Sequence, residues 1–286
     1  MDALLPPEMA RRAEEIGEAK ARMAVSTMFT LAVLAGAFIS LGAVFSTVAT
    51  ANTGVSFGVN RLLGGVTFSL GLVLVIVAGA ELFTGNNLIV MAWASRRISL
   101  VDMLRNWGVA YVGNLVGAAG IAALVFASGH YKGGNGAIAT RALDIGSTKT
   151  SLTIGNAVLL GVLANILVCL AVWLCFSARS VADKIIAIVF PITAFVAAGF
   201  EHSIANAYFV PEALLIRQHA PRSYLTAIGV HLGLSQSDMA TLHHAQPRAG
   251  HHRQPHRWRT ARRPRVLVRL PTSGPQVARC DAPGLS

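Results

Sequence analysis

The sequence contains little charge for its length. Only 13% of its 286 residues are charged and 53% are hydrophobic, whereas roughly 25% of the residues in a soluble domain carry a charge. So few polar side chains do not cover the surface of a water-soluble fold of this size. The apolar residues also collect in blocks near or above the roughly 20 residues that an α-helix needs to cross a bilayer. The composition therefore predicts an all-α integral membrane protein.

Cysteine is scarce as well. Cys169 and Cys175 lie in one apolar block, on different faces of a helix, and Cys280 lies in the polar C-terminal region. We therefore expect no disulfide, no metal site and no cofactor. A cleavable signal peptide is not apparent either, because acidic residues stand among the basic ones in residues 1–22 and a full-length apolar block follows.

Composition divides the chain into four parts. Residues 1–22 interleave apolar and charged positions, which suits a short amphipathic helix at the membrane surface. The membrane domain follows over 23–216, then a loop over 217–240 and a basic tail over 241–286, which we expect to be disordered. We predict turn-prone or polar connections at 51–65 and 132–150, and five spans at 23–50, 66–94, 107–128, 152–176 and 184–216.

Two of these spans are interrupted by polar residues. Thr84-Gly85-Asn86-Asn87 interrupts the second span and Glu201-His202-Ser203 interrupts the fifth. Irregular backbone at membrane depth is tolerated only where protein buries it or where it lines a water-filled path. Paired broken helices in corresponding positions indicate a transport site within an inverted repeat. The pattern predicts a repeat of three plus three helices, with the sixth helix missing from this chain.

The basic residues in the connections favour one orientation. Lys and Arg are more frequent in cytoplasmic loops than in outward-facing ones. The predicted spans place more of them on the N-terminal side than on the other, so we expect a multi-pass protein of the inner (plasma) membrane with a cytoplasmic N-terminus. The N-terminal side carries Arg11, Arg12, Lys20, Arg22, Arg96, Arg97, Arg105, Arg179 and Lys184, and the other side carries Arg61, Lys132, Arg141, Lys149, Arg217 and Arg222.

Glu201 and His202 are ionisable groups within a predicted span. Such groups are rare and usually face a pathway or one another. The alternative is a pair at a helix end that reaches the membrane surface. The adjacent interruption favours the pathway, where a histidine with a pKa near ~6.5 donates a hydrogen bond or a proton near neutral pH.

Other residues are candidates on weaker local grounds. Thr84 offers a hydroxyl to a small polar solute or caps the following half-helix. Asn165, inside an apolar span, needs a partner on another helix or along the path. Lys149 lies just outside that span and either attracts anions or anchors at the interface. Four apolar residues are candidates for constrictions, although ordinary packing explains each one taken alone: Phe68, Leu72, Leu82 and Phe195.

Four longer motifs resemble the formate/nitrite transporter family. The resemblance covers about 21–218, and the motifs are long enough to be specific. They are Gly79-Ala-Glu-Leu-Phe-Thr-Gly-Asn86, Asn106-Trp with Tyr111-Val-Gly-Asn114, Leu163-Ala-Asn-Ile-Leu-Val-Cys-Leu-Ala-Val-Trp173 and Gly199-Phe-Glu-His-Ser-Ile-Ala-Asn206.

The resemblance implies a homopentamer of aquaporin-like protomers, each with its own pore. It places Thr84 in a gating loop at the broken second helix, and His202 with Asn165 and Thr84 at a central site. It makes Lys149 an outer residue that attracts anions. It also implies that the apolar constrictions are formed by Phe68, Leu72, Leu82 and Phe195.

A physical mechanism fits these roles. A bare carboxylate in a dry constriction carries a large desolvation cost that the neutral acid avoids. Lys149 raises the local concentration of the anion, and desolvation further inside raises the anion's pKa until it takes a proton. Whether His202 supplies that proton or only hydrogen-bonds the anion stays open.

The basic C-terminal region departs from this family. Of the net charge of +11, much comes from arginines over 248–279. One interpretation is a disordered arm that binds anionic lipid or RNA. Read one nucleotide forward, however, the codons of 246–258 permit Asn-Leu-x-Pro-Val-Thr-Ile-Gly-Asn-Leu-Ile-Gly-Gly, and those of 265–271 permit Val-Tyr-Trp-Phe-Val-Tyr-Leu. These strings resemble the start and end of the family's sixth span. We therefore interpret 241–286 as a frameshift product, with the shift between about Ser235 and Thr241.

Two classes of function fit the sequence. The first is transport of formate or a similar small monovalent anion or weak acid, with nitrite and hydrosulfide as alternatives. The second is a membrane-anchored protein that binds through its Arg-rich tail. An enzyme is not expected, because no nucleophile, metal cluster or phosphate loop accompanies Glu201 and His202. We predict the channel, with formate or nitrite as its small-anion substrate, membrane lipid around it and no nucleic-acid partner.

Overall fold

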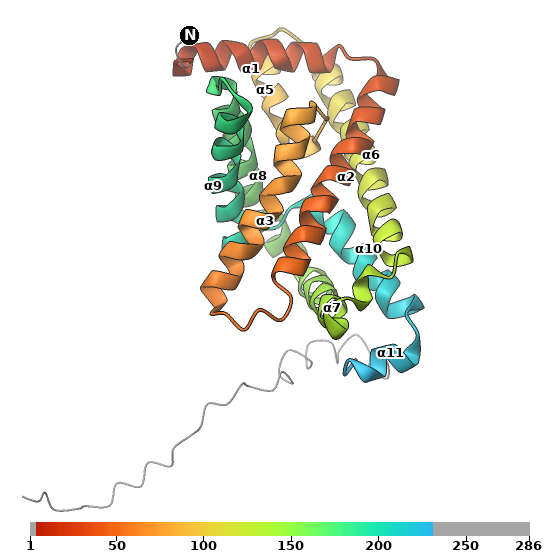
Figure 1. The fold of residues 1–286 in the computed structure, drawn as a ribbon. Coiled ribbons are helices and arrows are strands. Elements are labelled where there is room, and N and C mark those ends of the chain that lie inside the picture. Colours follow the sequence, from red (N-terminus) through yellow and green to blue (C-terminus); the bar gives the residue numbers. More distant parts are fainter. Residues whose placement is uncertain (1–3, 231–286) are drawn as a thin grey trace, which may run out of the picture. The chain divides into compact units, whose positions relative to one another are not determined.

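A computed structural model describes residues 4–230, which form a helical bundle without strands in that part of the chain. Helix α1 (Pro6–Ala21) lies across one end of the bundle (Figure 1). Its buried residues recur every four positions, at Met9, Ala13, Gly17 and Ala21, so one stripe of the helix packs on the bundle while Arg11, Arg12 and Glu15 are exposed. This is the amphipathic helix that the alternating pattern of residues 1–22 predicts.

Five helices of the described region are long and apolar enough to cross a membrane. They have 18 to 28 residues and windows of mean hydropathy from 1.9 to 2.7. Within the bundle α2 packs against α3 and α6, α3 packs against α9, and α8 packs against α9. They are α2 (Val25–Ala49), α3 (Phe57–Ala78), α6 (Leu100–Ala127), α8 (Ile154–Ser177) and α9 (Val181–Ala198).

Small residues permit the closest of these helix contacts. A Cβ on Gly65 of α3 would overlap the backbone of Thr193 in α9. Gly117 of α6 leaves no room for a Cβ against the Val33 backbone of α2. Small residues that allow backbones to approach closely are typical of helix contacts in membranes. Packing also explains why α3 begins at Phe57, earlier than the predicted 66, because Gly64 and Gly65 are helical contact positions against Thr50 and Thr193 and not turn residues.

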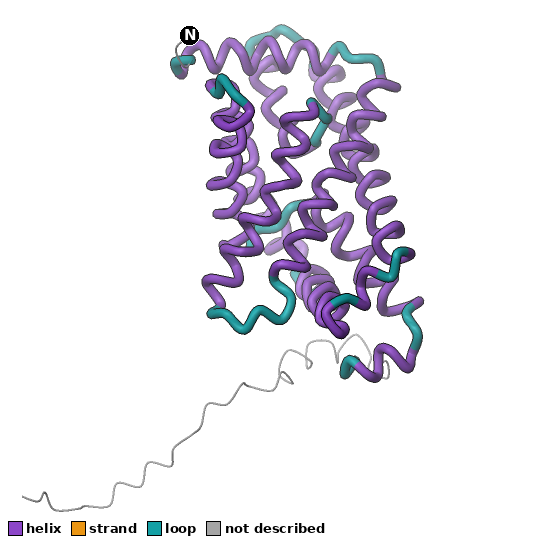
Figure 2. The backbone as a smooth tube through the Cα atoms, viewed as in Figure 1, coloured by secondary structure: helices purple, strands orange, loops and turns teal. Residues whose placement is uncertain are grey.

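Both predicted interruptions occur, slightly N-terminal to the polar residues that signalled them. Helix α3 ends at Gly79 (φ 71°) and α9 ends at Gly199 (φ 82°), in the left-handed conformation that glycine adopts most readily. Short extended segments follow inside the bundle (Figure 2). Helical structure then resumes as α4 (Phe83–Asn86), a 3₁₀ turn (Asn87–Ile89) and α5 (Val90–Ala94) in one case, and as α10 (Ser203–His219) in the other.

The prediction of a polar loop over 132–150 is wrong. After the 3₁₀ turns His130–Lys132 and Gly134–Gly136, residues Ala137–Thr150 form helix α7. The helix buries Ile138, Ala139, Ala142 and Gly146, and Gly146 lies directly against Ala213 of α10. Burial of this narrow stripe stabilises a helix whose polar composition predicts a loop. Residues Arg222–Ala227, within the predicted 217–240 loop, form the short helix α11.

The two surface helices α1 and α7 lie at opposite ends of the bundle (Figure 1). Helix α2 runs away from the α1 end of the bundle. Helix α8 runs toward that end, where its last residue, Ser177, donates a hydrogen bond to Leu4 O (3.1 Å). The predicted basic tail, the frameshift and the fate of a sixth span fall on residues 231–286 and lie outside the described residues.

Candidate functional site

His202 and Thr84 join the two interruptions at the centre of the bundle. His202 is the N-cap of α10, and its Nδ1 accepts a hydrogen bond from Ala205 N (3.1 Å). Its Nε2 lies 3.1 Å from Thr84 Oγ1, in the first turn of α4. Both side chains are buried, at 4% and 5% exposure. Residues 118 positions apart in the chain are thereby held together.

The N-cap bond assigns the tautomer of His202. A nitrogen that accepts a bond from a backbone N–H carries no proton of its own, so the proton of a neutral ring is on Nε2. Nε2–H then donates to Thr84 Oγ1, and the hydroxyl proton of Thr84 is left to donate elsewhere. In this arrangement the Nε2–H of His202 is engaged by Thr84, and the Thr84 hydroxyl is the donor left free for a solute.

Apolar rings lie directly beside this pair. Phe195 stacks on His202, with ring centroids 5.8 Å apart, and meets Phe68 edge to face, also at 5.8 Å. Leu72 and Leu82 are buried in the same apolar cluster. The structure therefore brings together all four side chains that were predicted to form constrictions.

Glu201 binds Lys149 and does not face an open path alone. Lys149 Nζ donates to both carboxylate oxygens (2.8 and 2.9 Å), and Asn206 Nδ2 donates to Oε2 (2.9 Å). The side chains of Lys149 and Glu201 are 17% and 8% exposed. Lys149 comes from the last turn of α7 and is thus tied to the second interruption by a largely buried ion pair.

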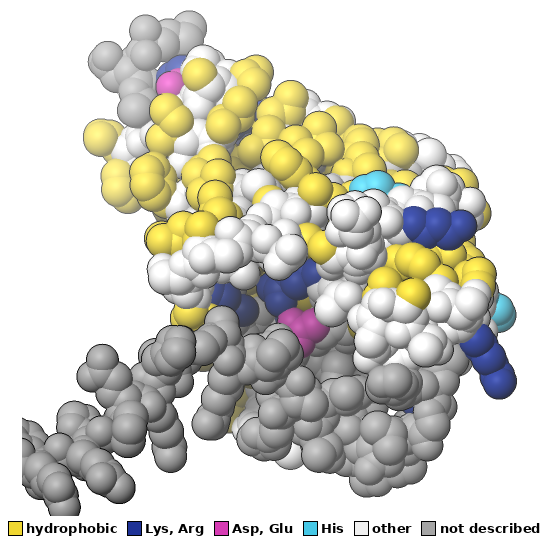
Figure 3. Space-filling view, turned by 60° about the horizontal axis from the view of Figure 1, so that its bottom comes forward, with side chains coloured by type: hydrophobic (Ala, Val, Ile, Leu, Met, Phe, Trp, Pro, Cys, Tyr) yellow, Lys and Arg dark blue, Asp and Glu magenta, His cyan; other side chains and the backbone are white. Residues whose placement is uncertain are grey.

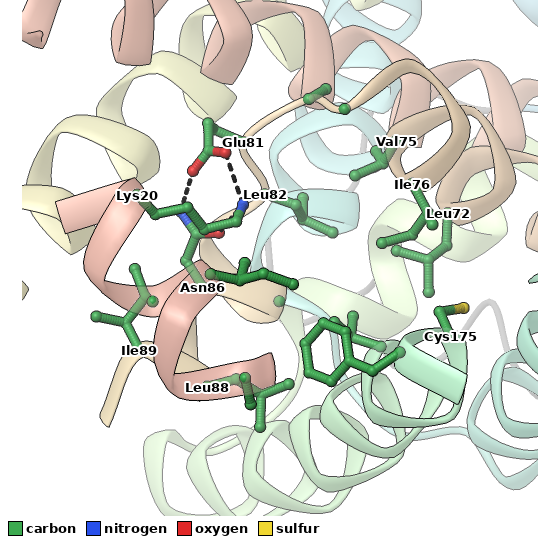
Figure 4. A pocket seen from close by; sticks show the side chains of 18 of the residues that line it. Lys20, Leu72, Val75, Ile76, Glu81, Leu82, Asn86, Leu88, Ile89 and Cys175 are labelled. Carbon is green, nitrogen blue, oxygen red and sulfur yellow. Dashed lines mark hydrogen bonds and ion pairs between the residues drawn. The ribbon is translucent and has the colours of Figure 1, made fainter. Parts of the chain in front are cut away.

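The first interruption contains a matching cluster that sequence reasoning missed. Glu81 accepts from Lys20 Nζ (2.6 Å) and from Asn86 Nδ2 (2.8 Å), and Lys20 also donates to Asn86 Oδ1 (3.0 Å). Figure 4 shows these three side chains converging beside the apolar residues of the pocket. A signal was present, because an asparagine follows Glu81 by five residues just as Asn206 follows Glu201.

Two cavities flank the ring cluster. The first, about 400 Å³, is lined by Lys20, Glu81, Leu72 and Leu82 and lies toward α1 (Figure 4). The second, about 600 Å³, is lined by Thr84, Asn165, Glu201 and His202. Four of the five predicted path residues thus share one cavity, and Lys149 contacts that cavity through Glu201.

Asn165 lines the second cavity, and one of its polar atoms has no partner. Its Nδ2 donates to Cys169 Sγ (3.7 Å), and its buried Oδ1 has no hydrogen-bond partner among residues 4–230. A buried amide oxygen without a partner is unfavourable unless water, a ligand or another group satisfies it.

Metal-binding chemistry finds no support in the described part of the chain. Residues 4–230 contain no group of three or more His, Cys, Asp or Glu side chains arranged to hold a metal ion. Cys169 and Cys175 are both free thiols.

At the α7 end, basic side chains gather beside an acidic one in a recess of the surface (Figure 3). The side chains at the interruptions can bind a solute through hydrogen bonds and charge.

Known proteins resemble this chain over most of its length. The sequence pattern of the formate/nitrite transporter family matches residues 7–235. The formate channel FocA of Escherichia coli is 47% identical over 229 residues, which is 80% of each chain. The formate channel FocA of Haemophilus influenzae is 38% identical over 80% of this chain and 81% of its own.

Solved structures agree with these relatives. A pentameric formate channel with formate bound has a TM-score of 0.71 and 41% identity, over 75% of this chain and 84% of that one. An ion channel of the FNT family has a TM-score of 0.67 and 27% identity, over 82% of this chain and 94% of that one. The residues that the family pattern matches, 7–235, include both interruptions.

Proposed function

Because this chain belongs to the formate/nitrite transporter family, we propose that it carries formate, or a monovalent anion of similar size, through a pore within each protomer of a homopentamer. Membership of the family confirms the resemblance that its motifs indicate. The protein is a multi-pass membrane transport protein and not an enzyme. The observation that carries the choice of substrate is the Thr84–His202 pair, whose hydroxyl donor lies beside an apolar ring cluster.

The cavity beside α1 marks one end of the proposed path, and the Thr84–His202 pair lies at its centre. A solute enters the cavity beside α1, passes Leu72 and Leu82, then Phe68 and Phe195, and reaches Thr84, His202 and Asn165. The apolar section excludes ions with a full hydration shell, because a bare charge there is poorly solvated. A small carboxylate regains hydrogen bonds at the donors beyond it.

We assign His202 the role of a hydrogen-bond donor. Its Nδ1 is occupied by the N-cap bond, so Nε2–H is the only proton that the neutral ring offers. Full transfer of that proton from a neutral imidazole would leave an anionic ring in a buried site, which is strongly unfavourable. Protonation at Nδ1 would first break the cap of α10. The geometry therefore favours an imidazole that orients and polarises the solute without giving up its proton.

The proton that neutralises the solute comes, in this proposal, from water in the wider cavities. Desolvation raises the pKa of a carboxylate as it enters the apolar section, so the solute crosses that section as the neutral acid. Lys149 lies beyond this section and contributes positive potential to the α7 end of the path. Its bond to Glu201 (2.8 Å) supports a fixed position for this charge, and the paired carboxylate offsets part of the positive potential.

We place the protein in the inner (plasma) membrane with the α1 end in the cytoplasm. The excess of Lys and Arg at that end over the α7 end supports this orientation. Lipid covers the apolar outer faces of the spans. Cysteine labelling tests this orientation. A membrane-impermeant reagent is expected to react in intact cells with a single cysteine introduced at Lys132 but not with one introduced at Arg12.

Uptake of labelled formate into proteoliposomes tests the substrate. We expect the purified chain to take up formate faster than protein-free vesicles, and excess nitrite to compete. Substitution of His202 by Phe is expected to slow uptake, with assembly unchanged by size-exclusion chromatography. Formate uptake that equals the protein-free rate in folded protein would overturn the proposal.

A further inference from the structure

Arg61 of α3 binds the C-terminal end of α9, where the second interruption begins. Its Nε donates a hydrogen bond to Ala197 O (3.0 Å), in the last turn of α9. A Cβ on Gly199 would lie 2.5 Å from Arg61 Nη2, so the guanidinium covers the glycine whose positive φ ends that helix. Gly199 precedes His202 by three residues. A cation therefore lies beside the break that carries the proposed binding groups.

The main chain of the second interruption leaves this carbonyl without a donor. The turn at Gly199 bonds the two carbonyls before Ala197 and not that of Ala197 itself. In a continuous helix Glu201 N would donate to Ala197 O, but here it donates to Leu160 O (3.3 Å). The last carbonyls of a helix are commonly bonded by side-chain donors, and cations are favoured there. Arg61 thus satisfies an acceptor that the broken backbone leaves unpaired.

Packing on both sides fixes Arg61 in this position. One turn later in α3, Gly65 leaves no room for a Cβ against the backbone of Thr193, so α3 and α9 are in direct contact there. One turn earlier, the Phe57 ring faces the guanidinium, with 5.8 Å between Arg61 Cζ and the ring centroid. The face of an aromatic ring attracts a cation. The charge of this partly buried side chain is therefore held at one place beside the end of α9.

The charge of Arg61 acts on the second interruption. The Glu201 carboxylate attracts the guanidinium, and Arg141 of α7 repels it. Arg141 forms an ion pair with Asp144 (2.7 Å), whereas Arg61 forms none with any residue from 4 to 230. Lys149 already offsets the charge of Glu201 at 2.8 Å. Arg61 therefore adds positive charge at this break beyond what its acidic residue neutralises.

The end of α9 is unfavourable for an anion unless a cation offsets it. The unpaired carbonyls at a helix C-terminus carry a partial negative charge of roughly half an elementary charge. This end lies next to His202, where the proposed function requires a bound anion to be stable. The first interruption follows Leu82 and has no such donor, because no side chain within residues 4–230 bonds the carbonyls of 76–78 at the end of α3. The cation thus accompanies the half that carries the histidine.

We propose that Arg61 determines how strongly the site at Thr84 and His202 prefers an anion, because its guanidinium offsets the negative end of α9. Arg61 is a positioning residue. It acts through the backbone of the second interruption and through its charge, without contacting the solute. When that charge is removed, the carbonyls of α9 repel an anion at the site and the affinity for the anion falls. The inference rests on the proposed function, since it concerns the affinity of that site for formate or a similar anion.

The concentration dependence of formate uptake into proteoliposomes tests this role. Arg61→Met keeps an apolar stem but removes the charge and the donor. The formate concentration that gives half-maximal uptake is expected to rise several-fold in this variant, because the local potential favours the anion less. Arg61→Lys keeps the charge and is expected to restore most of the affinity. Arg222→Met removes an exposed arginine of α11 and is the matched control, with half-maximal uptake expected at the wild-type concentration.

A purely structural role of Arg61 gives a different result. It lowers the maximum uptake rate and leaves the half-maximal concentration unchanged, and that outcome would overturn the inference. Equal shifts in Arg61→Met and Arg61→Lys, or in Arg222→Met, would overturn it as well. If Arg61→Met does not assemble, Arg61→Gln, which keeps an amide donor without the charge, replaces it with the same expected shift. Wild-type protein that takes up no formate would refute the proposed function and this inference together, whereas saturable wild-type uptake without a shift in the variant refutes this inference alone.

Discussion

The two broken spans share one backbone arrangement and differ at the N-cap residue of the helix that follows each break. In each, a glycine with positive φ ends the first helix, and a buried glutamate is held by a lysine from a surface helix and by an asparagine five residues later. The N-cap that follows is Leu82 in the first span and His202 in the second. In both interruptions the ion pair holds the backbone. The difference between leucine and histidine at the N-cap gives only the second interruption a side chain that hydrogen-bonds Thr84.

The two halves also differ in how the interruption is covered. Asn114 of α6 satisfies the backbone of the first interruption, whereas no residue between 4 and 230 does the same for the second. The shared scaffold is thus complete in one half and open in the other. Five substitutions, taken in four experiments, separate the residues that hold the backbone of the interruptions from those that hydrogen-bond the solute.

The largest effect is expected from removing either buried glutamate. Glu81→Ala and Glu201→Ala each leave a lysine without its partner, and loss of one member of a buried ion pair destabilises a protein by about 3–5 kcal/mol. Thermal unfolding of the purified protein in detergent measures the change. Glu15→Ala is the control, because its carboxylate is exposed and pairs with the exposed Arg12 (3.4 Å), and such surface pairs contribute about 0–1 kcal/mol. A large loss at one glutamate and none at the other would show that the two clusters are not equivalent.

Next in size is His202→Leu, which gives the second interruption the N-cap residue of the first. It removes the donor to Thr84 and, under the proposed function, the donor to the anion. A hydrogen bond to a charged group contributes about 1.5–3 kcal/mol, so formate flux is expected to fall roughly 10- to 100-fold. His202→Asn keeps an N-cap acceptor and separates the cap from the donor. Unchanged flux in His202→Leu would remove His202 from the path.

A smaller effect is expected from Asn114→Leu, which makes the first half resemble the open second half. Phe83 N and Glu81 O lose their partner, at a cost of about 1–3 kcal/mol in stability. Val116→Ala, at an exposed position of the same helix, is the matched control. The change in unfolding temperature of the two variants measures the difference. Equal changes would indicate that Asn114 does not stabilise the interruption.

The smallest effect is expected from Thr84→Val, which keeps the shape of the side chain and removes its hydroxyl. The loss of one neutral hydrogen bond, about 1 kcal/mol, is expected to slow formate flux about fivefold. Thr84→Ser keeps the hydroxyl and is expected to retain most of the flux. If Val and Ser behave alike in the liposome assay, Thr84 serves only to fill space beside His202.

Local patterns predicted the spans and the interruptions because each depends on residues that are near in sequence. Apolar runs report the length of a membrane helix, and the polar residues at 84–87 and 201–203 marked both interruptions to within a few residues. The helix α7 was missed because its polar composition resembles a loop. Its stripe of Ile138, Ala139, Ala142 and Gly146 becomes a helix signal only once α10 is known to cover it.

The sequence by itself determined the membrane class, the two broken spans and the resemblance that led to Thr84, His202 and the four apolar side chains. Only the tertiary structure decided the partners. It paired Lys149 with Glu201, Lys20 with Glu81, and Asn114 with the first interruption. These bonds join residues 31 to 61 positions apart in the chain. Helical periodicity reports only which residues share a face of one helix. The choice between a free lysine and a paired one therefore depends on how the helices pack.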